Sequence, residues 1–250
     1  MRLEDRTVFV TGAGSGIGRA TALLAASEGA AVACADVDEK TLDETVSLLK
    51  QAGGRAAGAV CNVTDMASVR DAVEGCVKTF GGLQALFNVA GTGALQHTET
   101  VTEDDWNRVI AVNLTGTFFV SQAALPHLLA NRRSSIVNVA SVAGLNGQAY
   151  CAAYCASKFG VVGLTKALAV EYVKKGLRVN CVCPAGVKTP LMGQMAPPPD
   201  ADPDLLARFG LVMKFTHPEE VAEALVYLTS NAARSINGVA LPMDFGNSAT

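Results

Sequence analysis

A tyrosine and a lysine four residues apart are the first side chains in this sequence that could carry out acid–base chemistry. Tyr154 and Lys158 fall in a stretch with helical spacing, where residues four apart project from one face. A free tyrosine has a pKa of about 10, and a nearby ammonium group lowers that pKa by favouring the phenolate. Bringing it towards neutrality requires about 3 to 4 kcal/mol. The pair predicts a proton-transferring tyrosine; the alternative is an exposed pair of the kind that helices carry by chance.

Two further polar residues lie where they could assist such a tyrosine. Ser141 follows the apolar stretch Ile136–Ala140, at the end of a predicted strand, which is where ligands of doubly wound folds bind. This position favours a contact with a substrate oxygen, and the alternative is a turn or helix cap. Asn113 follows apolar residues in a predicted helix, so it is either catalytic or a structural hydrogen-bonding group.

A glycine-rich loop follows the first predicted strand. The segment from Thr11 to Gly18 reads TGAGSGIG and is followed at once by a helical pattern. A strand, a glycine turn and a helix start present free backbone N–H groups and a positive helix end to a pyrophosphate. The general dinucleotide spacing has a glycine where this chain has Ile17, so that fingerprint fails in detail. The loop still predicts a dinucleotide site.

An aspartate at the end of the second predicted strand indicates which dinucleotide binds. Asp36 lies at about the distance from the loop where a carboxylate meets the adenosine ribose. Such a carboxylate accepts hydrogen bonds from the ribose hydroxyls and repels a 2′-phosphate. Neither Gly14-Ser15 nor Val37-Asp38 supplies the cation that NADP requires. We therefore expect NAD rather than NADP, unless Asp36 only caps the next helix, a role that is equally open to Asp38.

Short apolar stretches alternate with helix-length segments along the chain, which predicts an α/β fold with a doubly wound, parallel, mostly seven-stranded sheet. Glycines at 29, 53, 54, 81, 82 and 176 follow helical segments and are expected to end them. The predicted strands are Thr7–Thr11, Ala31–Ala35, Ala56–Val60, Ala85–Asn88, Ser135–Ala140, Arg178–Val182 and one near Val239–Pro242; the predicted helices are Ile17–Glu28, Glu39–Gln51, Asp65–Phe80, Asp104–Leu129 and Ala152–Lys174.

One segment breaks this alternation. Residues 190–215 combine three consecutive prolines with aspartates and many apolar side chains, Leu211 and Met213 among them. A proline-broken, apolar insertion between a strand and the last helix is typical of a substrate lid. We expect one catalytic domain over residues 1–250 with this lid at about 190–215; the alternative is that the insertion only packs against the domain.

Composition and charge limit the classes of partner. With a net charge of −3 and 17% charged residues, the chain has no obvious attraction for nucleic acid or an anionic membrane. No apolar stretch reads as long enough to cross a bilayer, and the charged N-terminus does not resemble a signal peptide. The seven cysteines are odd in number and scattered, which favours a reducing cytoplasm. With three histidines, none near a cysteine pair, we expect buried thiols and no metal.

Taken in order, these motifs resemble the short-chain dehydrogenase/reductase family along essentially the whole chain. The resemblance rests on Thr11-Gly12 with Gly16 and Gly18, Asn88-Val89-Ala90-Gly91, Asn113 in Val112-Asn113-Leu114, Ser141, Tyr154 with Lys158, and Pro184 to Thr189. The sequence departs from the family at Val89, where a second asparagine is common, at Ala185, where a glycine usually follows the proline, and at Phe245, which interrupts an Asp-Gly-Gly ending.

The resemblance implies a catalytic role for each of four residues. Tyr154 would act as the general acid in reduction and the base in oxidation, and Ser141 would hydrogen-bond the substrate oxygen. Lys158 would also bind the nicotinamide ribose, and Asn113 would hold a water that links the lysine to solvent. Hydride would pass directly between nicotinamide and the substrate carbon, so the chemistry needs no metal.

The resemblance also implies which residues surround the two ligands. NAD would be bound by Gly12, Ser15, Gly16, Ile17, Gly18, Asp36, Asn62, Val63, Asn88, Ala90, Gly91, Tyr154, Lys158, Pro184, Gly186, Val187 and Thr189. Ser141, Gln148, Tyr154, Leu191 and Met192 would line the substrate pocket. The family's common tetramer implies a homotetramer.

The function implied is NAD-dependent hydride transfer to or from a secondary alcohol or ketone of hydrophobic or mixed character. Three alternatives remain open at this point. The same fold supports epimerases and dehydratases, and a dinucleotide sensor or interaction protein without turnover would share it. An acyl-carrier ketoreductase resembles the chain but usually prefers NADP and a basic docking patch.

Overall fold

The fold is built on a parallel sheet of seven strands, as the sequence predicts. The computed structural model describes residues 1–209 and 214–249. Within these residues the strand order is β3-β2-β1-β4-β5-β6-β7, and every neighbouring pair is parallel. The strands are β1 (Thr7–Thr11), β2 (Ala31–Asp36), β3 (Ala56–Val60), β4 (Ala85–Asn88), β5 (Ser135–Val139), β6 (Arg178–Pro184) and β7 (Ala240–Met243).

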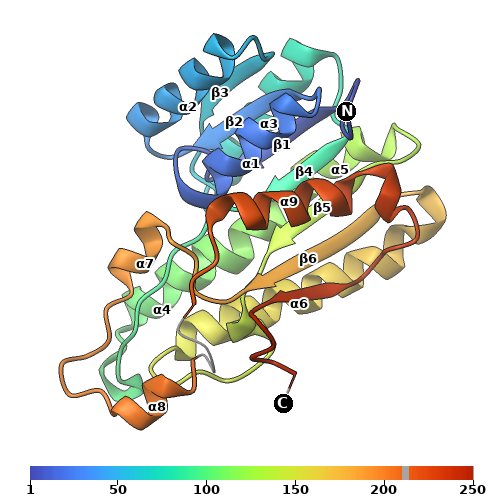
Figure 1. Ribbon diagram of the computed structural model, residues 1–250. Helices are drawn as coiled ribbons and strands as arrows, with labels where there is room; N and C mark the ends of the chain where they lie inside the picture. Colours follow the sequence, from blue (N-terminus) through green and yellow to red (C-terminus); the bar gives the residue numbers. More distant parts are fainter. Residues whose placement is uncertain (210–213, 250) are drawn as a thin grey trace.

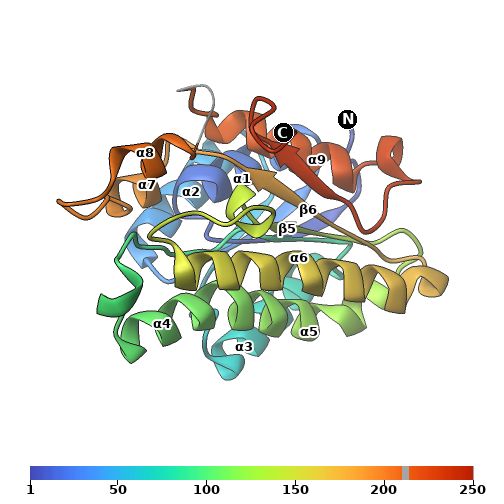
Figure 2. The same cartoon turned by 90° about the horizontal axis from the view of Figure 1, so that it is seen from below.

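Helices cover both faces of this sheet, which makes a three-layer molecule (Figures 1 and 2). One face carries α1 (Gly16–Ser27), α2 (Glu39–Gln51) and α9 (Pro218–Thr229). The other carries α3 (Met66–Phe80), α4 (Glu103–Ile110), α5 (Gly116–Leu129) and α6 (Ala152–Tyr172). Short 3₁₀ turns lie at Thr98–Thr100, Val142–Gly144, Val173–Lys175 and Asn231–Ala233. The predicted doubly wound architecture is confirmed, with element ends shifted by one or two residues.

The central strand β1 shows why the predicted strands read as apolar stretches without polar alternation. All five of its residues are buried, because both faces of a doubly wound sheet are covered. Val8 and Val10 pack into the core under α1 and α9, whereas Phe9 packs into the core under α3 and α5. Parallel register also brings the carboxyl ends of the strands to one edge, where Asn88 of β4 pairs with Asn138 of β5.

The predicted helix Asp104–Leu129 contains a feature that its periodicity does not reveal. Between α4 and α5 the chain makes a π-helical turn over Ala111–Thr115, which places Asn113 in the interior. Wide turns of this kind occur often at functional sites because they redirect side chains.

This helix also corrects the expectation that no apolar stretch could cross a bilayer. Glu103–Leu129 spans 27 residues with a mean hydropathy of 1.4 in its most apolar window, so it passes by length and composition alone. In the fold α5 packs against α3, and α4 packs against α6. Of the apolar window, 39% is buried in the fold, so the helix is partly covered by its neighbours.

The segment after β6 contains two short helices that the sequence does not predict, α7 (Pro190–Gln194) and α8 (Pro203–Ala207). In Figure 1 they lie at one end of the molecule, away from β7. Leu211 and Met213, which belong to the expected lid, lie outside the described residues.

Two glycines of α3 test how the helices are specified. Gly75 lies inside the helix and a methyl group added there would contact nothing within 4 Å, whereas Gly81 ends it at φ +82°. We expect Gly75→Ala to raise the free energy of unfolding by about 0.5 to 1 kcal/mol, because alanine loses less conformational entropy than glycine. Gly81→Ala should lower the free energy of unfolding by about 1 to 2 kcal/mol, because the left-handed backbone conformation is strained in a residue that has a Cβ. Urea titration of both variants checks this, and equal effects would contradict it.

Candidate active site

Helix α6 brings Tyr154 and Lys158 together at the carboxyl edge of the sheet. The Lys158 Nζ lies 5.5 Å from the centre of the Tyr154 ring. Only 4% of Lys158 is exposed, and its amine donates a hydrogen bond of 2.9 Å to the carbonyl of Val139 at the end of β5. A buried lysine therefore lies close to a half-buried tyrosine, which is not the geometry of a solvent-exposed helix pair.

Burial shifts the pKa values of both groups. It lowers the pKa of Lys158 from 10.5 to about 8, partly offset by the thiols of Cys183 and Cys181, which favour the ammonium form. It raises the pKa of Tyr154 to about 12, while a hydrogen bond from Ser141 acts in the opposite direction. The sequence predicts that a nearby positive charge lowers the pKa of the tyrosine. The protein groups alone do not lower it, because removing water from the phenolate outweighs the hydrogen bond.

Ser141 caps a turn, which is one of the two roles that the sequence left open, and its contact with a substrate oxygen stays a prediction. Its hydroxyl accepts the Ala143 N–H at 3.2 Å and so caps the turn Val142–Gly144. The same hydroxyl contacts the phenol of Tyr154 and donates weakly to the Pro184 carbonyl at 3.4 Å. The cap therefore holds the hydroxyl beside the tyrosine.

Asn113 connects the loop after β4 to helix α6. Its Oδ1 accepts the Thr92 N–H at 2.8 Å, and its Nδ2 donates to the Thr92 carbonyl at 2.9 Å. The same Nδ2 donates to Ser157 Oγ at 3.0 Å, and Ser157 donates to the Tyr154 carbonyl at 2.8 Å. A methyl group built on Gly91 would lie 3.4 Å from Asn113 Oδ1 and 3.7 Å from Lys158 Nζ. The amide thus fixes the loop beside the lysine, and the water relay stays a prediction.

A cavity of about 550 Å³ runs from the glycine-rich loop to the start of α7. At its floor the main chains of Gly12 and Ala90 approach so closely that residue 12 has no room for a side chain. A methyl group on Gly12 would lie 2.9 Å from Ala90 Cα. Gly16 begins α1 there with φ +49°. The residues expected to contact the dinucleotide that line this cavity are Gly12, Ser15, Gly16, Ile17, Gly18, Asp36, Asn62, Val63, Ala90, Gly91 and Thr189.

Asp36 extends its carboxylate to one end of this cavity. The Gly14 N–H donates to its Oδ2 at 2.8 Å, and the Asp38 N–H donates to its Oδ1 at 3.0 Å. Helix α2 is capped by Asp38, whose side chain accepts the Thr41 N–H at 2.9 Å. The capping role that the sequence left open for Asp36 therefore belongs to Asp38.

Several expected dinucleotide contacts lie elsewhere. The expectation that Asn88 contacts the dinucleotide is corrected. Its side chain is buried behind the cavity wall and donates to Ser121 and Asn138. Its position at the last residue of a fully buried strand turns the side chain into the interior. The cavity wall also lacks five other residues expected to bind the dinucleotide, namely Tyr154, Lys158, Pro184, Gly186 and Val187.

Sequence reasoning missed part of the cavity wall. The additional residues are Val37, Cys61, Thr64, Val89, Arg108, Ala111, Val112 and Pro190, together with Leu191, which was expected to contact the substrate. Most of them are next to predicted residues along the chain, and this adjacency is the only feature of the sequence that could have indicated them. Arg108 is not next to any predicted residue; its guanidinium donates a 3.0 Å hydrogen bond to Thr92 Oγ1, on the loop after β4.

Apolar side chains cover the catalytic pair. A methyl group built on Gly93 would lie 3.0 Å from Met195 Sδ and 3.1 Å from the Tyr154 ring, so both groups pack against the same glycine. On the other side, a methyl on Gly186 would lie 2.9 Å from the Phe215 ring and 3.9 Å from Met192 Sδ. The Gln148 carbonyl accepts a weak hydrogen bond from Cys155 Sγ at 3.9 Å, on the loop that precedes α6.

Two contacts tie the insertion to the neighbouring loops. His97 Nε2 and Asp200 Oδ1 lie 3.0 Å apart, and the imidazole packs edge-on against Tyr150. The Asp202 N–H donates to the Tyr150 phenol oxygen at 2.8 Å. Loops that follow β4, β5 and β6 are thereby joined.

The cysteines fit the expectation of buried thiols. All seven are free, and all but Cys155 are buried. Among residues 1–209 and 214–249, no group of three or more His, Cys, Asp and Glu side chains could hold a metal ion.

Comparison with known proteins identifies the family that has this arrangement. The sequence model for the short chain dehydrogenase family matches residues 6–199. The chain belongs to the short-chain dehydrogenase/reductase family. This short-chain dehydrogenase is 39% identical to a 3-oxoacyl-[acyl-carrier-protein] reductase of Thermotoga maritima, with 98% of this chain and 99% of that protein covered. It is also 39% identical to a cyclohexanol dehydrogenase of Acinetobacter, with 95% and 92% covered.

The similarity extends to solved structures. A short chain dehydrogenase from Mycobacterium paratuberculosis bound to NAD superposes with a TM-score of 0.94 at 31% identity, over the whole of both chains. The family, the fold and the relatives establish that this short-chain dehydrogenase is an oxidoreductase acting on CH–OH groups.

Gly144 tests how the Ser141 turn is seated on α6. A methyl group there would lie 2.6 Å from the Lys158 carbonyl, whereas one on Gly147 would meet nothing within 4 Å. We expect Gly144→Ala to lower kcat by about ten-fold or more, because displacing Ser141 from Tyr154 misplaces the reacting groups. Gly147→Ala, the matched control, should keep kcat. Steady-state rates with circular dichroism as a folding check measure this, and a fully active, folded Gly144→Ala enzyme would refute it.

The buried amine makes a separate prediction about pH. Because the pKa of Lys158 lies at about 8 in the folded protein, its proton is lost as pH rises through that value, well before an exposed lysine would titrate. In ¹³Cε-lysine NMR, one resonance should titrate near pH 8 and be absent from Lys158→Met. If every lysine resonance titrated above pH 10, the amine would not be desolvated as described.

Proposed function

We propose that this enzyme transfers hydride between NAD and a secondary alcohol or ketone of hydrophobic or mixed character. The observation that carries the proposal is the cluster of Tyr154, Ser141 and buried Lys158 beside a cavity suited to a dinucleotide. A phenol, a hydroxyl and an amine gathered at one point can exchange a proton with a substrate oxygen and stabilise its charge.

The residues fit a nicotinamide dinucleotide on observations of this structure. The close approach of Gly12 to Ala90 leaves a floor without side chains, and the 12-residue helix α1 begins at the cavity, so its N–H groups suit a pyrophosphate. Gly16, Ile17 and Gly18 would hold the phosphates, and Val187 and Thr189 would hold the carboxamide. When bound, the nicotinamide ring supplies or takes up the hydride.

The protein's own part is proton transfer and orientation. Ser141 binds the substrate oxygen and sets it beside Tyr154, which donates its proton in reduction and accepts one in oxidation. Lys158 keeps a positive charge near the phenol below about pH 8 and binds the nicotinamide ribose. Asn113 fixes the loop at Thr92 and holds a water that returns protons to solvent. The raised pKa of Tyr154 suits the acid role, and a cationic nicotinamide would act in the lowering direction.

The coenzyme is NAD rather than NADP. Asp36 supports this choice because two backbone N–H groups hold its carboxylate at the cavity wall, where it can bind both ribose hydroxyls and repel a 2′-phosphate. The neighbour that binds NAD agrees with the assignment.

The substrate is an uncharged alcohol or ketone that the insertion covers. Met195 offers apolar surface near Tyr154, and Phe215 offers it beside Gly186. The contacts of Asp200 and Asp202 with His97 and Tyr150 support a lid over the pocket. Ser141, Gln148, Leu191 and Met192 complete the proposed pocket. The cyclohexanol dehydrogenase relative supports a substrate of this polarity.

Acyl-carrier ketoreduction is the second candidate, favoured by 39% identity to a reductase of that kind. Asp36 argues against its usual NADP, and the net charge of −3 argues against a strongly basic docking surface. A sensor without turnover would have no need for the Ser141, Tyr154 and Lys158 cluster. An epimerase or dehydratase would show substrate loss without net reduction of NAD.

Assembly and location are parts of the same proposal. The family resemblance supports a homotetramer. The odd, scattered cysteines support the cytoplasm, and the weak net charge supports partners other than nucleic acid or membrane.

Reduction of NAD at 340 nm across a panel of secondary alcohols tests the function. We expect turnover with apolar and mixed substrates and a loss of about 100-fold or more in Tyr154→Phe, because the variant lacks the proton-transferring oxygen. NADP should support much less turnover. The exposed Tyr227 provides a matched control, and Tyr227→Phe should keep full activity. If no substrate in the panel is turned over although NAD binds, the sensor is favoured. NADP-linked reduction of acyl thioesters would favour the ketoreductase.

A further inference from the structure

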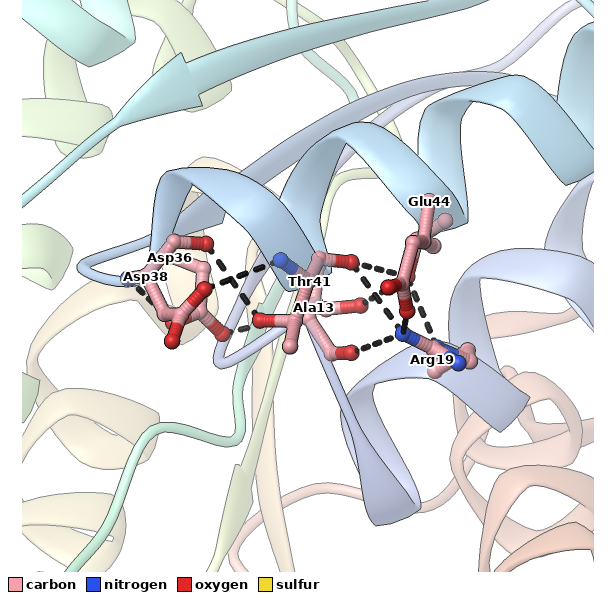
Figure 3. A network of polar contacts seen from close by, with 8 residues as sticks. Ala13, Arg19, Asp36, Asp38, Thr41 and Glu44 are labelled. Atoms are coloured by element: carbon pink, nitrogen blue, oxygen red, sulfur yellow. Dashed lines mark hydrogen bonds and ion pairs between the residues drawn. The ribbon is translucent and has the colours of Figure 1, made fainter.

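Arg19, in the first turn of α1, is the centre of a polar network that joins the glycine-rich loop to α2 (Figure 3). Its Nη2 donates to the Gly14 carbonyl at 2.6 Å and to the Thr41 carbonyl at 3.1 Å, and it pairs with the Glu44 carboxylate at 3.1 Å. Its Nε donates to Thr45 Oγ1 at 2.9 Å. The guanidinium is therefore held on several sides by α2 and the loop.

Gly14 connects this network to the coenzyme site. The carbonyl of Gly14 accepts from Arg19, and its N–H donates to Asp36 Oδ2 at 2.8 Å. A methyl group on Gly14 would lie 2.9 Å from that same oxygen, so loop and carboxylate pack directly together. The hydrogen bond from Arg19 orients the peptide groups of Gly14. It thereby also orients the Gly14 N–H, which donates to Asp36.

The network also accounts for a cation that sequence reasoning overlooked. Gly14-Ser15 and Val37-Asp38 supply no Arg or Lys, yet Arg19, the first residue after the loop, brings its guanidinium to the carbonyl of Gly14. An unpaired guanidinium there would attract a 2′-phosphate, since its fork of donors suits phosphate oxygens. Glu44 supplies the opposite charge and an acceptor, with about half of its side chain exposed.

We propose that Arg19, held by Glu44, is a positioning residue for coenzyme selection. By fixing Gly14 it holds the Asp36 carboxylate towards the ribose, and its pairing with Glu44 withholds the positive charge from a 2′-phosphate. This inference rests on the proposed preference for NAD. It assigns part of that preference to two residues outside the cavity wall.

The test measures dissociation constants for NAD and NADP by calorimetry on the intact enzyme. Arg19→Met should weaken NAD by about ten-fold and reduce the ratio of the NADP constant to the NAD constant, because Asp36 loses its orientation. Arg19→Lys should restore part of that ratio. Glu44→Gln should reduce the ratio differently, by strengthening NADP several-fold while NAD binding stays nearly unchanged.

Asp43→Asn is the matched control, since it removes an exposed carboxylate one residue before Glu44 in α2 and should leave the ratio within about two-fold. Parallel changes for NAD and NADP in the Arg19 and Glu44 variants would show a merely structural tether and overturn the inference. Asp36→Ala separates the two claims. A ratio near one in the parent enzyme would overturn the NAD preference itself. If Asp36→Ala alone changes the ratio, only the role of Arg19 fails.

Discussion

The site depends on the burial of one amine and the strand end that accepts its hydrogen bond. Lys158 is almost wholly enclosed, and a buried amine is tolerated only where an acceptor replaces water. The Val139 carbonyl is that acceptor. Val139 is the last residue of β5, one position beyond Asn138, where the pairing of β5 with β4 ends. Helix α6 is thereby anchored to the carboxyl edge, and Tyr154 is brought to Ser141.

The coenzyme side is built differently, because most of its expected contacts come from main-chain atoms. Because glycines form the floor of the cavity, no side chains project from it, and the N–H groups at the start of α1 face the cavity. Asp36 adds one charge whose direction is set by the N–H groups of Gly14 and Asp38. Polar contacts beyond the cavity wall, such as those of Arg19, determine how rigidly that charge is held.

The substrate side is built from loops, and it is here that members of one family differ. The segments after β4, β5 and β6 meet through His97, Tyr150 and Asp200, and Met195 packs over the tyrosine. None of these contacts is needed for the sheet or for dinucleotide binding. A common fold can therefore carry distinct substrates, and the activity of a relative indicates chemistry more firmly than it indicates substrate.

The sequence by itself determined the seven parallel strands, the long helices, the glycine-rich loop and the pair Tyr154 and Lys158, because hydrophobic period and local spacing are properties of neighbouring residues. It did not determine the π-helical turn at Asn113, the burial of Asn88 or the place of Arg108 and Arg19. It also did not reveal that burial acts to raise the pKa of Tyr154, against the lowering effect expected from nearby positive charge. Only the tertiary structure decided these, because desolvation and long-range hydrogen bonds depend on segments that are far apart in the chain.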